Sequence, residues 1–165
     1  AYLSPEMKST GEAIGYDSSL TRALYKALRS SGMDVANYGT LFATIADVDK
    51  EKALPLIRRF YNLGFNIEGT KGTAEFLRQN GIRTRYRAKL SEGSDEIFTA
   101  LRQGHINYVI NTMDISQGDS TRDGYEIRRC AVENNVSIFT SLETVQVLLD
   151  VLEEITLGVS TIDAE

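Results

Sequence analysis

The sequence predicts an α/β fold in which a five-stranded parallel sheet is flanked by helices. From residue 39 onward, short apolar runs alternate with amphipathic segments of helical length. Parallel neighbours need a crossover connection, so this alternation favours βαβ units with helices on both faces of one sheet. At 165 residues and 42% hydrophobic content, the chain fits about one globular domain.

The elements are expected in a simple order along the chain. Residues 1–17 have no sustained period and are dense in Pro, Gly, Ser and Thr, so they read as irregular. A helix is expected over 18–31, where leucines and alanines recur at helical spacing before Gly32. Apolar runs place strands at 39–46, 65–69, 84–89, 107–111 and 137–140, and amphipathic runs place helices at 49–64, 73–81, 94–104, 121–135 and 141–155.

Local signals support most of these boundaries. Gly64 and Gly81 follow two helices as stop residues, whereas Ser94 and Ser141 are good N-caps. Pro55 is the exception, because it lies beyond the first turn if Asp49 caps its helix. We expect that helix either to kink at Pro55 or to begin near it.

Composition excludes several function classes. No apolar run approaches the roughly 20 residues that span a bilayer, and no segment resembles a secretory signal. The single Cys130 and single His105 exclude a disulfide framework and the usual zinc ligand sets. A net charge of −5 argues against general nucleic-acid binding. We therefore expect a cytoplasmic protein without a membrane or nucleic-acid partner and, since it begins at Ala1, a piece of a longer chain.

Polar residues follow four of the expected strands at the edge where those strands end. Strand by strand they are Thr44 with Lys50; Thr70, Gly72 and Thr73; Lys89; and Asn111 with Thr112. Ligands of open α/β sheets bind at this edge, and helix amides, hydroxyls and lysines suit an anion there. We expect a phosphorylated small molecule and no carboxylate among its nearest neighbours. Ordinary turns and solvated lysines are the alternative interpretation.

Catalytic chemistry has less support in the sequence. His105 is expected to be a solvated turn residue at the amino end of a strand, and Cys130 a core residue. Asp47, Glu92 and Asp123 are conceivable bases, but nothing in the sequence indicates a shifted pKa. The chain contains no Ser-His-acid order, nucleophile elbow or Walker lysine.

Several longer segments match one family in order and spacing. They are EMKSTGEAIG, DKEKALPLIRRFYNLGFNIEGTKGTAEFL, AKLSEG, INT and DGYEIRR. In these segments the chain resembles the carboxyl-terminal regulatory region of the carbamoyl phosphate synthetase large subunit. The resemblance implies a connector at 1–36, a methylglyoxal-synthase-like domain at 37–158 with strand order 3-2-1-4-5, and a tail at 159–165.

The resemblance also implies what this region does. It would bind an allosteric effector such as UMP, IMP or phosphoribosyl pyrophosphate, with no cofactor or metal of its own. The phosphate would be held by Lys50, Thr70, Gly72, Thr73 and Lys89, and the sugar or base by Thr44, Asn111 and Thr112. The parent would be a glutamine-dependent ligase of pyrimidine or arginine biosynthesis that uses ATP and Mg, and the partners would be the remaining synthetase domains and the small glutaminase subunit.

Some positions depart from the family pattern. Ser91 replaces a His that is often found there, and Met113 with the following DISQGDS replaces a more basic loop, so the effector stays open. An alternative is a methylglyoxal-synthase-like lyase acting on dihydroxyacetone phosphate, although its Gly-Gly-Asp segment is absent after the fourth strand. A structural or oligomerisation module is the third interpretation.

Overall fold

The computed structural model describes residues 38–112 and 119–156, together with residue 23. Within this part of the chain, five parallel strands form one sheet in the order β3-β2-β1-β4-β5. The strands are β1 (Thr40–Thr44), β2 (Asn66–Gly69), β3 (Thr84–Tyr86), β4 (Tyr108–Asn111) and β5 (Ser137–Phe139). The predicted fold class, strand number and strand order are confirmed.

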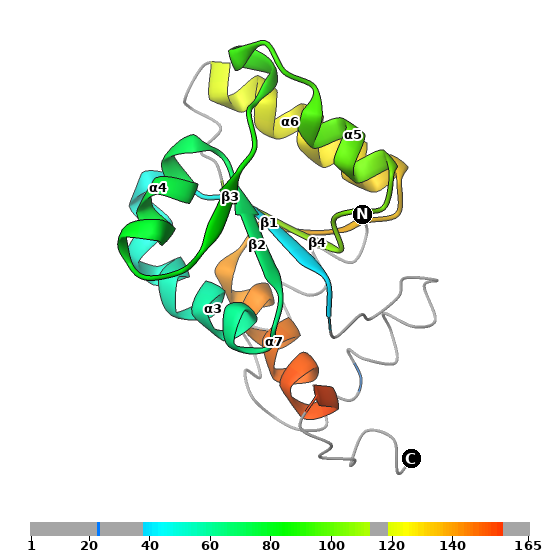
Figure 1. The fold of residues 1–165 in the computed structure, drawn as a ribbon. Coiled ribbons are helices and arrows are strands. Elements are labelled where there is room, and N and C mark those ends of the chain that lie inside the picture. The colour runs from blue at the N-terminus through cyan, green and yellow to red at the C-terminus, as the bar shows by residue number, and fades with distance from the viewer. Residues whose placement is uncertain (1–22, 24–37, 113–118, 157–165) are drawn as a thin grey trace.

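Helices cover both faces of this sheet, as Figure 1 shows. One face packs against α3 (Lys50–Asn62), α4 (Lys71–Gln79) and α7 (Leu142–Thr156). The other packs against α5 (Glu96–Arg102) and α6 (Asp119–Glu133). Two short 3-10 turns, η1 (Asp47–Asp49) and η2 (Leu90–Glu92), follow β1 and β3.

The central strand β1 contributes to both halves of the core. All five of its residues are buried, as expected for a parallel strand covered on both faces. Leu41 and Ala43 belong to the cluster beneath α3 and α7, whereas Phe42 belongs to the cluster beneath α5 and α6. Cys130 on α6 lies in the second cluster, which confirms its predicted core role.

Several expected boundaries need correction. Helix α3 begins at Lys50, whose backbone N–H bonds to the Asp47 carbonyl, so a start near Pro55 is wrong. Helix α4 begins at Lys71, two residues earlier than expected, which makes the threonine-rich turn its first turn. Strand β3 ends at Tyr86 instead of residue 89, and the next residue, Arg87, is held by a buried ion pair with Glu68.

Other predicted features are confirmed. Ser141 caps α7, since its Oγ accepts from the Thr144 backbone N–H at 3.4 Å. Gly64 and Gly81 end their helices with φ of +100° and +83°. His105 is exposed ahead of β4. The predicted irregular segment at 1–17 and tail at 159–165 lie outside the described residues, as does the predicted helix at 18–31 apart from Ala23, which is helical.

The packing of α6 can be tested through Cys130, the chain's single cysteine. The residue is 7% exposed, and burial raises the pKa of its thiol. Because the thiolate is the reactive form, we expect iodoacetamide at pH 8 to alkylate the native protein at least about tenfold more slowly than the urea-unfolded protein. Equal rates would show that α6 does not pack on the sheet as described.

Candidate functional site

At the carboxyl edge of the sheet, the connections that follow two neighbouring strands leave toward opposite faces. β1 and β4 are neighbours, yet α3 leaves β1 toward one face and α6 leaves β4 toward the other. Thr44 and Asn111 are paired at the ends of these two strands. Such a divergence is where open α/β sheets bind ligands, because the connections separate and leave room between them.

Three threonine hydroxyls meet near this edge. Thr70 Oγ1 lies 3.4 Å from both Thr44 Oγ1 and Thr73 Oγ1. Thr73 Oγ1 also accepts from the Ile45 backbone N–H at 3.0 Å. All three side chains are buried, and the hydroxyl contacts are longer than the usual 2.7–2.8 Å or so for such bonds. A hydroxyl that accepts still has a proton to donate, so this cluster can serve a stronger acceptor.

The first turn of α4 adds backbone donors to the hydroxyls. Thr70 is the N-cap residue, but its side chain makes no capping bond. The first intrahelical bond runs from the Ala74 N–H to the Thr70 carbonyl at 2.7 Å. The amides of Lys71, Gly72 and Thr73 precede that bond, so the helix itself offers them no acceptor. The positive end of the helix dipole therefore points at this edge.

Lys50 brings a positive charge to the same place. A Cβ built on Gly72 would lie 3.2 Å from Lys50 Nζ, so the ammonium rests against the first turn of α4. The Lys50 side chain is 17% exposed and binds the carboxylate of Asp47, which is 88% exposed. That bond lowers the pKa of Asp47. The expectation of no carboxylate among the nearest residues is thus wrong at Asp47.

Lys89 lies on a loop that Glu92 holds in shape. The Lys89 backbone N–H donates to Glu92 Oε1 at 2.9 Å, and the Tyr86 hydroxyl donates to Glu92 Oε2 at 2.7 Å. These two bonds lower the pKa of Glu92, with smaller contributions from the charges of Lys89 and Lys71. The charges of Lys71, at the start of α4, and of Lys89 thus both act on this carboxylate.

A buried ion pair fastens that loop to the sheet. Arg87 Nε donates to Glu68 Oε1 at 2.6 Å, and its side chain is 11% exposed against 10% for Glu68. The Arg87 backbone N–H also bonds to the Gly69 carbonyl at 2.9 Å. Sequence reasoning missed this pair, although a glutamate inside an apolar strand was a usable signal, because buried charges are normally paired.

Asn111 and Thr112 tie the end of β4 to α6 and to the loop after β1. Asn111 Nδ2 donates to the Gly124 carbonyl at 3.0 Å, which ties β4 to α6. Thr112 Oγ1 accepts from the Ala46 N–H at 3.1 Å, which ties it to the loop after β1. Both residues lie at the expected edge, and their contact with a sugar or base stays a prediction.

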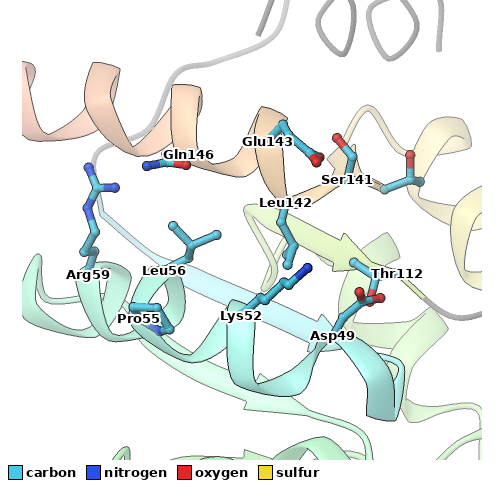
Figure 2. Close-up of a pocket in the computed structure, with 11 residues that line it drawn as sticks. Asp49, Lys52, Pro55, Leu56, Arg59, Thr112, Ser141, Leu142, Glu143 and Gln146 are labelled. Atoms are coloured by element: carbon cyan, nitrogen blue, oxygen red, sulfur yellow. The ribbon is translucent and has the colours of Figure 1, made fainter. Parts of the chain in front are cut away.

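A groove of about 670 Å³ runs between α3 and α7 beside this edge. Lys52 on α3 and Leu142 on α7 extend into it from opposite sides (Figure 2). Thr112 lines the groove, whereas the lysines and threonines of the expected phosphate site do not. At its far end Arg59 binds Asp150 and Glu153 of α7. Sequence reasoning did not foresee this groove, because it depends on how two helices pack.

The part of the chain that the structure describes contains neither a metal-binding cluster nor a membrane-spanning helix. No group of three or more His, Cys, Asp or Glu side chains there could hold a metal ion. None of the described helices has the length and apolar character needed to cross a membrane.

Asp123, one of the conceivable bases, is buried and accepts a hydrogen bond from the Ser91 hydroxyl at 2.7 Å, which joins η2 to α6.

Comparison with known families identifies the fold family of this region. A family model described as the MGS-like domain matches residues 52–140, more than half of the chain. The matched range begins within α3 and ends just after β5. It contains Thr70, Gly72, Thr73 and Lys89, and it begins two residues after Lys50.

Two glycines at the edge should respond differently to alanine. In Gly69→Ala the new Cβ would lie 3.0 Å from the Ala43 carbonyl oxygen, which is backbone, so we expect about 1–3 kcal/mol of destabilisation from overpacking. In Gly72→Ala the Cβ would meet only the flexible end of Lys50. Urea unfolding should show little loss for Gly72→Ala, and equal losses would contradict this geometry.

The ion pair behind the Lys89 loop gives a second stability test. Arg87→Met leaves the Glu68 charge buried without its partner, so we expect a loss of about 3–5 kcal/mol in urea unfolding. The double variant Glu68→Leu/Arg87→Met should lose less than Arg87→Met alone, because no charge remains buried. As a control, Arg129→Met breaks an exposed pair with Glu133 and should change little. Additive losses in the double variant would contradict the pairing.

Proposed function

Because this chain belongs to the MGS-like domain family, we propose that it is a regulatory effector-binding domain of the kind found in the large subunit of carbamoyl phosphate synthetase. Its ligand is a phosphorylated small molecule such as UMP, IMP or phosphoribosyl pyrophosphate. The phosphate binds at the carboxyl edge of the sheet, at Lys50, Thr70, Gly72, Thr73 and Lys89. Thr44, Asn111 and Thr112 face the sugar or base.

One observation supports this proposal most directly: the Lys50 ammonium rests against the first turn of α4. The helix dipole makes that position unfavourable for a cation and favourable for an anion. Lysine and dipole stabilise each other only when an anion lies between them, and a phosphate has the oxygens to accept from both. The Thr70 and Thr73 hydroxyls, buried beside that turn, supply further donors.

The proposal extends to the assembly in which the domain works. Its partners are the other synthetase domains and the small glutaminase subunit, in the cytoplasm, and the parent chain supplies the ATP- and Mg-dependent chemistry. An effector shifts the parent's activity only by as much as its affinity differs between the active and inactive states.

A lyase acting on dihydroxyacetone phosphate is the alternative that the family match also accommodates. Proton abstraction needs a carboxylate that is a competent base. Two of the conceivable bases, Asp47 and Glu92, have lowered pKa values, which makes them weaker bases. His105 is exposed at the amino end of β4, at the opposite edge of the sheet. These features favour binding over chemistry, and release of inorganic phosphate from dihydroxyacetone phosphate would reverse that preference.

The effector can be identified by thermal unfolding with UMP, IMP, phosphoribosyl pyrophosphate and inorganic phosphate. A ligand at about 100 times its dissociation constant adds about 2.7 kcal/mol, which raises the melting temperature by several degrees. We expect Lys50→Gln and Lys89→Gln to reduce that shift, because each removes a cation from the phosphate.

Lys52→Gln is the matched control for Lys50→Gln. Both lysines lie on α3 and both substitutions remove one charge, but Lys52 lines the groove between α3 and α7. The ligand-induced shift in the melting temperature of Lys52→Gln should equal that of the wild type. No shift with any of these ligands would favour the third interpretation, a structural or oligomerisation module, and an equal loss in Lys50→Gln and Lys52→Gln would move the site to the groove.

A further inference from the structure

We propose that Asp47 is a built-in competitor for the effector phosphate: its carboxylate occupies Lys50 in the free protein and gives Lys50 up when phosphate binds. This inference rests on the proposed function and concerns the affinity of that same site. It assigns to Asp47 a specificity-determining role rather than contact with the ligand.

The first step is the bond itself. Lys50 Nζ binds Asp47 Oδ1, and among the described residues this is the one hydrogen bond or ion pair in which the Lys50 ammonium takes part. The Lys50 side chain as a whole is 17% exposed, so water reaches it only in part. A phosphate that binds between Lys50 and the first turn of α4 must use the same ammonium.

The second step is that Asp47 can leave. Its side chain is 88% exposed and lies on the three-residue turn η1, so water can replace Lys50 as its partner. Glu92 is the instructive contrast, because it is also a carboxylate near lysines but is held by the Lys89 N–H and the Tyr86 hydroxyl. Glu92 keeps its place when the ligand binds, and Asp47 does not.

The third step is the consequence for specificity. In the free protein, Asp47 already supplies the single negative charge that the ammonium and the helix end favour. An incoming monoanion would exchange one carboxylate-like partner for another and gain little. A phosphate brings up to two negative charges and several acceptor oxygens, so it gains contacts with the α4 amides that Asp47 does not make. To occupy the site, a ligand must therefore bind Lys50 and the α4 amides more favourably than Asp47 binds Lys50.

The test is the dissociation constant of inorganic phosphate, measured by calorimetry on the whole chain at constant ionic strength. Asp47→Asn should bind phosphate about threefold to fivefold more tightly than the wild type, the effect of one exposed ion pair. Asp49→Asn is the matched control, because Asp49 lies on the same turn and makes no bond to Lys50. It removes the same charge and should change the dissociation constant by less than about 1.5-fold.

The outcomes separate this inference from the proposed function. Equal tightening in Asp47→Asn and Asp49→Asn would overturn the inference, because general electrostatics would then suffice. Weaker binding in Asp47→Asn would also overturn it, since Asp47 would be positioning Lys50 for the ligand. In both cases phosphate binding that Lys50→Gln weakens would leave the proposed function standing. No phosphate binding by the wild type or any variant would overturn this inference, and the proposed function would fall with it only if UMP, IMP and phosphoribosyl pyrophosphate also gave no thermal shift.

Discussion

A lysine ammonium held against the positive end of a helix is the interaction on which the site depends. Lys50 begins α3 and reaches Gly72 in the first turn of α4, so two helices that follow neighbouring strands converge on one small volume. The parallel sheet makes this convergence possible, because every strand ends at the same edge and each following helix starts there. The helix dipole disfavours a cation at this position and favours an anion, which is the physical basis of the proposed binding function.

Other residues at this edge fix the positions of the first turns of α3 and α4. Gly69 has no side chain, and the backbone of β2 therefore lies close to the Ala43 carbonyl of β1. Thr73 accepts from the Ile45 N–H and so links α4 to the loop after β1. Arg87 and Glu68 fasten the third loop in the same way. Small residues, hydroxyls and one buried ion pair thus fix the positions of the donors at this edge.

The site also contains its own negative charge. Asp47 binds Lys50, and the charges of Lys71 and Lys89 act on Glu92, so negative charge accompanies each of these lysines. Under the proposed function, this balance would keep the domain stable both with and without its ligand. The groove between α3 and α7 is a neighbouring feature that meets the edge at Thr112.

Local patterns in the sequence determined the fold class, because hydrophobic period and turn chemistry are properties of neighbouring residues. These patterns predicted five strands, and they predicted that Thr44, Thr70, Lys89 and Asn111 lie at the carboxyl edge of the sheet. The strand order came from the family resemblance, since alternation alone does not order parallel strands. Tertiary structure decided the pairing of Glu68 with Arg87, the contact of Lys50 with Gly72 and the groove between α3 and α7. These depend on how separate elements pack, and a period of two or 3.6 residues contains no information about which distant side chain will face another.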